Sequence, residues 1–346
     1  MDNVNATFST VNPKTHRVLE LFSGIGGMHY ALLRSGKSFE IVTAIDINPV
    51  ANQIYNHNFG LRMAKNSNIL GLTSEAICQM GVDTILMSPP CQPFSRNGNF
   101  GDVTDHRADP FVHICGMLED IPQVEFILLE NVKGFERSKA CELYKTKLSV
   151  AGFEYREYIL SPHNFGVPNT RHRYYCVAKR RGSLKTASSE QLITELGPKH
   201  IQMTKTISEL VEEDSQHLDK YLVKDALLQK RLAIMDVCTP DSTNSMCFTK
   251  AYTHYVEGTG SVYSPLARSQ FDTIYRQLIA SNDEDERRSL RSQLRLRFFT
   301  PREVARLMCF PDDFAFPAVT TDRQCYRVLG NSVNVLVVSS LLDELD

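Results

Sequence analysis

The sequence lacks several features that would assign a protein to a function class at once. It has no long run of apolar residues, and residues 1–17 are polar, so neither a membrane span nor a signal peptide is expected. The 38 Lys and Arg against 40 Asp and Glu give a net charge of −2, so no positive field over the whole molecule indicates a nucleic-acid partner. A polyanion would therefore have to bind a local basic patch.

Cysteine pairs and tryptophan are also missing. None of the nine cysteines stands in a CxxC motif, so we expect no metal site. Because no signal peptide is expected, we also expect the thiols to be reduced, in the cytoplasm, the nucleus or both. The chain has no Trp, so tryptophan fluorescence cannot report ligand binding. Its 346 residues, 42% hydrophobic and 23% charged, are typical of a globular protein of about two domains and exclude disordered and fibrous classes.

Short apolar segments alternate with helical patterns in the first half of the chain. Residues 17–22 and 41–45 have the composition of buried strands, and each is followed by a segment with helical apolar spacing. Further strands are expected at 83–87 and 126–129. This alternation predicts an α/β fold with a parallel, doubly wound sheet, whose ligands bind at the carboxyl ends of the strands.

The second half of the chain is less regular. Between residues 180 and 297 the sequence is more polar and alternates poorly, which indicates a smaller domain with flexible connections. Residues 300–303, Thr-Pro-Arg-Glu, form a helix-capping pattern, and that helix should end near Leu307. The apolar run 333–342 predicts a buried helix that returns to the first domain. We therefore expect a first domain at 1–179, a smaller domain with its connections at 180–297, and a C-terminal segment at 298–346 that returns to the first domain.

A glycine-rich turn follows the first expected strand, and it contains Phe22, Ser23, Gly24, Ile25, Gly26 and Gly27. Such a turn lets the backbone approach a ligand and directs helix-start amides at an anion, while Asp46 is placed to bind ribose hydroxyls. The turn lacks the GxGxxG spacing of a dinucleotide site, which favours a nucleoside with a carboxylate, such as S-adenosylmethionine, over NAD. A tight turn that needs glycine only for its own conformation is the alternative.

A cysteine between prolines follows the strand expected at 83–87. Cys91 stands in the segment Pro-Pro-Cys-Gln-Pro-Phe-Ser, on a stiff loop at the edge where ligands should bind. A nearby cation or helix start could lower the pKa of its thiol below about 8.5 and make it a nucleophile. A buried, unreactive cysteine is the alternative.

Five motifs in order carry a family resemblance. The Pro-Pro-Cys-Gln-Pro-Phe segment, with the glycine turn before it and Glu130-Asn131-Val132 after it, resembles the motifs of the nucleic-acid cytosine-C5 methyltransferases. Arg171-His172-Arg173 and Gly330-Asn331-Ser332-Val333 complete the set. The resemblance implies a Rossmann-like methyltransferase domain that uses S-adenosylmethionine, leaves S-adenosylhomocysteine, and carries a smaller target-recognition domain.

The chemistry of this family explains why these residue types are needed. C5 of cytosine is a poor nucleophile, but a thiolate added to C6 makes it enamine-like, and Cys91 would supply that thiolate. Glu130 would share a proton with N3 of the base, which requires a raised pKa in a dry pocket; a strand-end cap is the alternative. Arg171 and Arg173 alternate on an apparent strand and could hold the base O2 and a phosphate, or form a surface ion-pair row.

The resemblance also implies further contacts. The adenine should lie beside Asn68 and Ile69, after the third strand, where DNA-acting members commonly carry an acidic residue. The expected cofactor contacts outside the glycine turn are Asp46, Ile47, Asn68, Ile69, Pro89, Asn331, Ser332 and Val333. The expected substrate contacts are Ser95, Lys133, Cys247, Phe248, Thr249 and Lys250.

The catalytic motifs do not distinguish an RNA substrate from a DNA substrate. The distinction therefore has to come from the sequence of the smaller domain. Its Cys247-Phe248-Thr249 segment, with Gly258-Thr259-Gly260 after it, resembles the small eukaryotic branch that methylates an anticodon-loop cytosine of aspartate tRNA. Cys247 and Phe248 could equally be core residues of that domain. The arginines between 287 and 302 are either phosphate contacts or an ion-paired helix face.

The leading interpretation is a monomeric tRNA cytosine-C5 methyltransferase that acts on a base taken out of its stack. Two alternatives remain: a DNA cytosine-C5 methyltransferase, and a nucleic-acid-binding relative that has lost catalysis. DNA could also be a weak second substrate of the tRNA enzyme.

Overall fold

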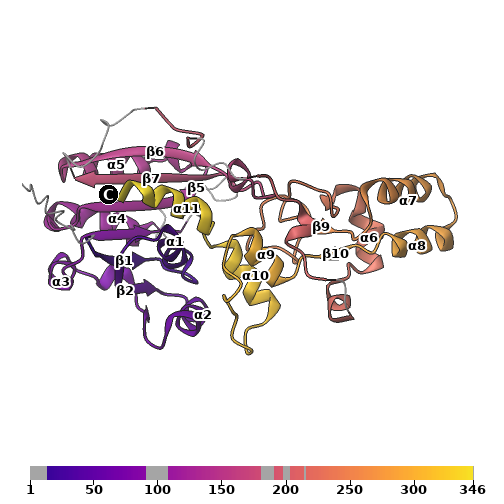
Figure 1. Ribbon diagram of the computed structural model, residues 1–346, viewed down its shortest axis with the longest axis horizontal. Helices are drawn as coiled ribbons and strands as arrows, with labels where there is room; N and C mark the ends of the chain where they lie inside the picture. Colours follow the sequence, from indigo (N-terminus) through magenta and orange to yellow (C-terminus); the bar gives the residue numbers. More distant parts are fainter. Residues whose placement is uncertain (1–13, 91–107, 181–190, 198–202, 214–215, 346) are drawn as a thin grey trace, which may run out of the picture.

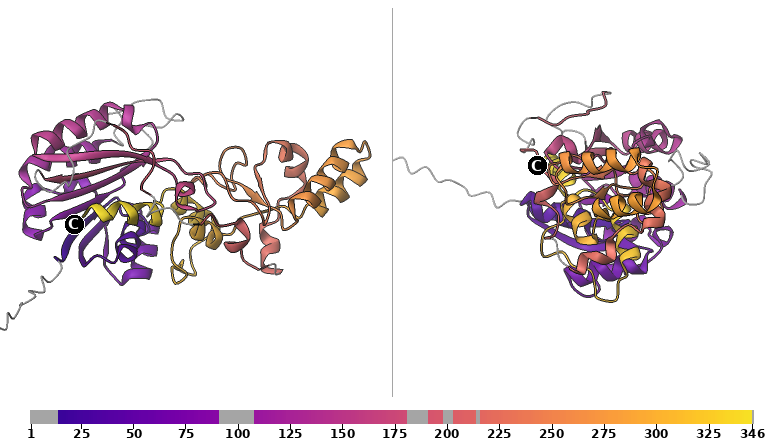
Figure 2. Two further views of the ribbon diagram at one scale, coloured as in Figure 1. Left: turned by 45° about the horizontal axis from the view of Figure 1, so that its top comes forward. Right: turned by 90° about the vertical axis from the view of Figure 1, so that its right-hand side faces the viewer.

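The computed structural model describes residues 14–90, 108–180, 191–197, 203–213 and 216–345. A larger lobe holds a seven-stranded sheet, and a narrower lobe extends from one end of it (Figure 1). The two lobes are joined by a region that contains α9 (Pro301–Leu307) and α10 (Asp322–Gly330). The left view in Figure 2 shows the same elongated arrangement, and the right view looks along the long axis with the smaller lobe in front.

The seven strands run in the order β3-β2-β1-β4-β5-β7-β6. Their bounds are β1 (His16–Leu21), β2 (Phe39–Asp46), β3 (Ala64–Asn66), β4 (Thr84–Met87), β5 (Phe126–Val132), β6 (Phe153–Leu160) and β7 (Arg173–Arg180). The predicted α/β class is confirmed. The expected parallel pairing is confirmed for β1 to β5, whereas β7 is antiparallel to both of its neighbours. The short connection 161–172 between β6 and β7 contains no crossover helix, so the chain reverses direction there.

Helices cover both faces of this sheet (Figure 1). One core contains side chains of α1 (Gly27–Ser35), α2 (Pro49–Phe59) and α11 (Val335–Leu341). The other contains side chains of α3 (Ser74–Met80), α4 (Asp109–Met117) and α5 (Lys139–Val150). In β1, Val18 packs in the first core and Leu19 in the second, and both are fully buried, as expected for a central strand covered on both faces.

The predicted capping pattern starts α9 at Pro301 and the helix ends at Leu307, as the sequence indicated. The Thr300 hydroxyl accepts a hydrogen bond from the Glu303 backbone N–H at 3.1 Å, and the Glu303 carboxylate accepts from the Thr300 N–H at 2.8 Å. Glu303 is fully buried. Its negative charge is compensated there, because the carboxylate also accepts hydrogen bonds from both terminal nitrogens of Arg297, at 2.7 and 2.8 Å. The cap therefore also joins the smaller lobe to the region between the lobes.

The smaller lobe has a three-stranded sheet in the order β10-β9-β8 and its own hydrophobic core. Its elements are β8 (Val237–Cys238), β9 (Val262–Tyr263), β10 (Arg297–Phe298), α6 (Asp225–Arg231), α7 (Arg268–Ala280) and α8 (Glu284–Gln293). Helices α7 and α8 form the end of the molecule farthest from the large sheet (Figure 1).

The C-terminal segment returns to the larger lobe, where α11 packs against α1 (Figure 1). Within the described ranges, one stretch, Asp322–Leu345, is as long and apolar as a membrane span, and 72% of its most apolar window is buried inside the protein. Packing against the sheet accounts for this apolar composition.

Candidate active site

A cavity of about 350 Å³ opens at the carboxyl ends of β1, β2, β4 and β5. Most of the cofactor contacts expected from the sequence line it: Phe22, Ser23, Gly24, Gly27, Asp46, Ile47, Asn68, Ile69, Pro89, Asn331, Ser332 and Val333. The expected catalytic residues Glu130, Arg171 and Arg173 line it too, and so does Lys250 from the smaller lobe. Residues more than 200 positions apart thus meet at one edge of the sheet, as the fold class predicts.

Other expected contacts lie elsewhere. Ile25 is 1% exposed and belongs to the core, and a Cβ added to Gly26 would collide with the Phe59 ring. Lys133 is exposed outside the cavity lining, and Cys247, Phe248 and Thr249 do not line the cavity either. Cys91 and Ser95 lie outside the described residues.

The glycine turn bends sharply between β1 and α1. Gly24 and Gly26 have positive φ angles of 54° and 85°, a conformation that glycine adopts without strain. A Cβ at Gly27 would come within 2.8 Å of the Val333 side chain, so the start of α1 and the segment 331–333 touch. Glycine is therefore required here both for the bend and for contact between two walls of the cavity.

Asp46 stands at the end of β2 and joins two turns. Its carboxylate accepts hydrogen bonds from the backbone N–H of Gly24 at 2.8 Å and of Asn48 at 2.7 Å. Burial raises the pKa of Asp46, and these two hydrogen bonds oppose that rise. Each oxygen keeps an unused lone pair, so the carboxylate can accept further hydrogen bonds from hydroxyl groups in the cavity.

A second carboxyl group lies behind the glycine turn. Glu20 on β1 is fully buried and accepts a hydrogen bond from the Tyr55 hydroxyl at 2.7 Å. Burial raises the pKa of Glu20 to about 8, and the nearby charge of Asp46 adds to the rise. Glu20 is therefore largely protonated at neutral pH and adds little negative charge behind the turn.

Three features of the lining fit S-adenosylmethionine. Ile47 is an apolar side chain left 68% exposed at the cavity, as a surface for the adenine ring would be. The buried Ser23 hydroxyl has no hydrogen-bond partner within the described part of the chain and can pair with a polar ligand group. Asn68 uses its side-chain oxygen to accept from the Leu70 N–H at 3.0 Å, which leaves its amide N–H groups as donors.

The loop that leads to Cys91 is held at two points. The Ser88 hydroxyl donates to the Phe22 carbonyl at 3.1 Å, and the Asn131 amide donates to the Pro89 carbonyl at 3.3 Å. Asn131 is 1% exposed. Sequence reasoning gave neither Ser88 nor Asn131 a role, although Asn131 is the middle residue of the Glu-Asn-Val motif and could have been considered.

Glu130 faces Arg173 across neighbouring strands. Its carboxylate oxygen lies 3.4 Å from Nε of Arg173, and Glu130 is 7% exposed. Burial raises the pKa of Glu130, while the positive charges of Arg173 and Arg171 oppose the rise. The predicted strand ends too early, because β5 continues through Glu130 to Val132.

Arg171 does not alternate with Arg173 on one strand, because β7 begins only at Arg173. Arg171 is 2% exposed and donates to the carbonyls of Phe248 at 3.2 Å and Ser332 at 2.6 Å. It also donates to the Gly330 carbonyl at 3.1 Å. Arg171 thus joins the smaller lobe to the C-terminal segment, and its burial rules out the alternative of a surface ion-pair row at this residue.

The approach of these segments depends on Gly330. A Cβ at this position would collide with the backbone of Thr249 and Lys250. The Gly-Asn-Ser-Val motif is therefore more than a turn: its glycine allows the backbone of the smaller lobe to lie directly against the end of α10, and this contact brings Lys250 to the cavity.

Cys247 lies between two arginines. Its sulfur accepts hydrogen bonds from Arg171 at 3.3 Å and from Arg173 at 3.8 Å. Burial alone would raise the pKa of Cys247, but the two guanidinium groups lower it below its usual value. The adjacent Phe248 is 3% exposed and packs edge-on against Phe299, so the expectation of a substrate contact by its side chain is corrected to a core position.

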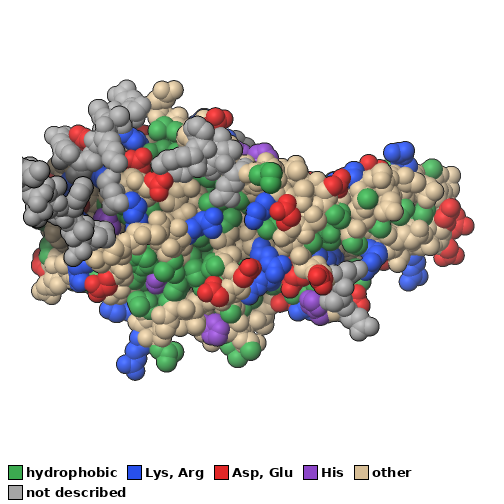
Figure 3. All heavy atoms as spheres, in the orientation of Figure 1, with side chains coloured by type: hydrophobic (Ala, Val, Ile, Leu, Met, Phe, Trp, Pro, Cys, Tyr) green, Lys and Arg blue, Asp and Glu red, His purple; other side chains and the backbone are tan. Residues whose placement is uncertain are grey.

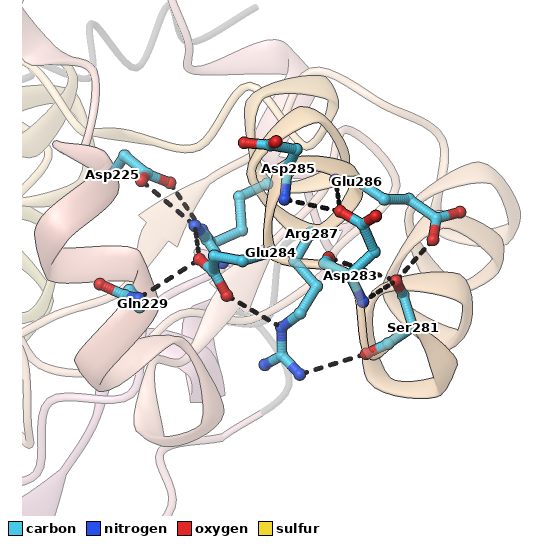
Figure 4. Close-up of polar contacts among 9 residues, drawn as sticks. Asp225, Gln229, Ser281, Asp283, Glu284, Asp285, Glu286 and Arg287 are labelled. Atoms are coloured by element: carbon cyan, nitrogen blue, oxygen red, sulfur yellow. Dashed lines mark hydrogen bonds and ion pairs between the residues drawn. The ribbon is translucent and has the colours of Figure 1, made fainter.

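Several arginines between 287 and 302 belong to ion pairs within the protein. Figure 4 shows Arg287 directed at Glu284 and Ser281 at the start of α8. Arg291 is 3% exposed and binds Asp225 at 2.6 Å and Glu284 at 2.8 Å. Acidic side chains also gather at the far end of the smaller lobe (Figure 3). These contacts favour the ion-paired helix face over a phosphate-binding patch at α8.

The chain matches known proteins along almost its whole length. The family model of the C-5 cytosine-specific DNA methylases matches residues 16–346. A tRNA (cytosine(38)-C(5))-methyltransferase of Spodoptera frugiperda is 45% identical over 330 residues, which cover 95% of this chain and 98% of the relative. The Homo sapiens protein of the same description is 36% identical over 384 residues, with 94% and 98% covered.

A DNA (cytosine-5)-methyltransferase of Dictyostelium discoideum is also similar, at 34% identity over 368 residues, with 95% of this chain and 94% of the relative covered. The crystal structure of a mutant of Spodoptera frugiperda DNMT2 superposes with a TM-score of 0.87 at 44% identity and covers 95% of this chain and 99% of its own. The ordered motifs, the fold and these matches agree: the chain belongs to the C-5 cytosine-specific DNA methylase family.

Proposed function

We propose that this protein transfers a methyl group from S-adenosylmethionine to C5 of a tRNA cytosine, the anticodon-loop position 38 named in its relatives. The observation that carries the proposal is the 45% identity to a tRNA (cytosine(38)-C(5))-methyltransferase, which extends over both lobes. The site geometry supports it, since Glu130, Arg173 and Lys250 meet at one cavity.

The chain's own residues supply the steps that activate the base. The Cys91 thiolate adds to C6, and Glu130 in its protonated form donates a hydrogen bond to N3, where negative charge develops. Arg173, 3.4 Å from Glu130, orients that carboxyl group. S-adenosylmethionine supplies the electrophilic methyl group. C5 bonds to the methyl group, a water molecule accepts the C5 proton, and the electrons of that C–H bond expel the Cys91 thiolate from C6, which restores the aromatic ring.

The cofactor would occupy the part of the cavity lined by the glycine turn. We assign its ribose to Asp46, its adenine to Ile47 and Asn68, and its amino-acid end to Ser23 and the segment 331–333. Main-chain amides at the start of α1 would face the negative carboxylate group of the ligand.

Two considerations favour tRNA over DNA as the substrate. An RNA loop already exposes unpaired bases, so moving one base into the cavity requires less unstacking than in a duplex. The arginine-rich face of α8 is engaged in ion pairs, which leaves few cations on that helix to follow a long duplex. DNA is the second candidate substrate, because the Dictyostelium discoideum relative is described as a DNA (cytosine-5)-methyltransferase.

We further propose that residues 180–297 recognise the target and that the segments on either side form the catalytic domain. We also propose, as expected from the sequence, that a monomer in the cytoplasm or the nucleus carries out the reaction, without a membrane.

Methyl transfer from labelled S-adenosylmethionine tests the substrate directly. Unmodified tRNA and unmethylated duplex DNA are offered separately, and the wild type should label tRNA at a cytosine of the anticodon loop. Label on DNA alone would establish the DNA methyltransferase instead. Label on neither substrate, with the cofactor still bound in a dialysis assay, would indicate the relative that has lost catalysis.

The Asp46→Ala variant should bind S-adenosylmethionine roughly 10- to 100-fold more weakly, because it loses charged hydrogen bonds and releases Gly24 from its position. Titration calorimetry measures the dissociation constant. Asp312→Ala is the matched control, since that carboxylate is 94% exposed and lies outside the cavity lining. Equal dissociation constants for wild type and Asp46→Ala would remove Asp46 from the cofactor site.

A further inference from the structure

Tyr255 is an unusual surface residue in this protein. Its side chain is 61% exposed, and no other Phe or Tyr of the described ranges is exposed to solvent to that degree. The His254 ring lies beside it, with ring centroids 4.4 Å apart and planes at 72°. Together the two rings form an exposed aromatic pair, which we call the 254–255 pair.

The backbone holds this pair in a fixed turn. The backbone N–H groups of His254 and Tyr255 both donate to the Ala251 carbonyl, at 3.0 and 3.1 Å. The Thr259 hydroxyl donates to the Tyr255 carbonyl at 2.5 Å. Thr253 adopts a positive φ of 68°, so the chain reverses direction between Ala251 and Tyr255. Because the backbone of the turn is already fixed and a tyrosine side chain has few rotatable bonds, Tyr255 loses little conformational entropy when it binds a ligand.

The turn is anchored next to the cavity. Tyr252 is 3% exposed, and its hydroxyl donates to the Ser261 carbonyl at 2.6 Å and accepts from the Phe299 N–H at 2.9 Å. Immediately before the turn, Lys250 lines the cavity, where its backbone packs against Gly330. The backbone N–H groups of the 254–255 pair bind the carbonyl of Ala251, which directly follows the cavity-lining Lys250, so the backbone of the pair lies close to the rim of the cavity.

These features suit a flat, unpaired base attached to a phosphate. Stacking on an exposed ring is how proteins hold splayed bases of single-stranded RNA, and it tolerates any base. The exposed Lys250 offers a cation for the adjoining phosphate. The exposed Glu257, two residues after Tyr255, repels phosphate and so favours a path of the RNA backbone on the Lys250 side. An apolar protein partner would instead need a continuous apolar surface, whereas Tyr255 stands among polar residues.

We propose that the 254–255 pair stacks on the unpaired nucleotide next to the cytosine that enters the cavity. This inference rests on the proposed RNA substrate and adds a contact that would hold the loop open while the target base is bound. Tyr255 would then contribute to RNA affinity and leave cofactor binding unchanged.

The test uses an RNA stem-loop with 2-aminopurine on either side of the target cytosine. Wild-type protein should change 2-aminopurine fluorescence at one of these positions, because stacking on an aromatic ring quenches it. Tyr255→Phe should keep the quenching, while Tyr255→Leu should lose it and bind the RNA roughly tenfold more weakly. Ile279→Ala removes a side chain that is 64% exposed on α7 and is the control for surface substitutions.

The outcomes separate this inference from the proposed function. Quenching that survives in Tyr255→Leu overturns the stacking contact, even if wild type methylates the same stem-loop. RNA binding by wild type without quenching at either position overturns it too. Failure of wild type to bind the stem-loop overturns the inference, and methyl transfer to tRNA and DNA then decides the function separately. Unchanged S-adenosylmethionine affinity in Tyr255→Leu excludes misfolding as the cause of lost quenching.

Discussion

The Cys91→Ala variant should lose methyl transfer by roughly 1,000-fold or more, because removal of a covalent nucleophile leaves only binding and positioning. C5 of cytosine cannot attack the methyl group at a useful rate unless a thiolate has added to C6. Affinity for S-adenosylmethionine should stay the same, since Cys91 is not among the expected cofactor contacts. Single-turnover transfer to tRNA and calorimetric binding measure the two quantities.

The matched control is a second cysteine, Cys78. Its side chain is exposed on α3, and its thiol donates hydrogen bonds to the Asp120 carbonyl and to the Gln123 side-chain oxygen. Cys78→Ala should therefore keep wild-type turnover. Near-wild-type turnover by Cys91→Ala would rule out covalent catalysis by this residue, and the same loss in both variants would indicate a general effect of removing thiols.

Local sequence patterns predicted the elements that surround the site with good accuracy. Thr300, Pro301 and Glu303 gave the start of α9, because a capping box and an N-terminal proline act within one helical turn. The glycine turn and Asp46 were placed at one edge because parallel strands direct their carboxyl ends to the same side. Such features depend on neighbours close in the sequence or on a general rule of the fold.

Features that depend on distant partners were not predictable in the same way. Arg171 lines the cavity as expected, but its acceptors at Phe248 and Gly330, which lie 77 and 159 residues away in the chain, were not foreseen. Arg291 was a candidate phosphate contact, and its partner Asp225 is 66 residues away. The sequence identifies each arginine, but it does not identify the distant carbonyl or carboxylate group that accepts its hydrogen bonds in the folded protein.

The same limit applies to strand direction. The sequence indicated a strand near Arg173 but not its direction; β7 pairs antiparallel with β5 and places Arg173 opposite Val132, beside Glu130. This pairing is what brings a guanidinium within 3.4 Å of the carboxylate. The motif order predicted that Glu130 and Arg173 belong to one site, while their contact geometry follows from the reversal after β6.

The second large effect is expected for Glu130→Gln, which should lower kcat roughly 100- to 10,000-fold with little change in the KM for tRNA. Glutamine keeps the shape and a hydrogen bond to the base, but it cannot transfer a proton to N3. In the wild type, the protonated form of Glu130 is the active one, and burial raises its pKa. The rate should therefore fall as pH rises through that raised pKa, and this part of the pH profile should be flat in Glu130→Gln.

Glu157→Gln is the matched control for this experiment. Glu157 is also a buried carboxylate of the same sheet, at 8% exposure, with Tyr174 as a hydrogen-bond donor at 2.9 Å and no place in the cavity lining. The substitution puts an equivalent amide into the sheet without touching the base, so kcat should remain near the wild-type value. If Glu130→Gln keeps the wild-type kcat and pH profile, then Glu130 holds the base by hydrogen bonding alone and the proton at N3 comes from another donor.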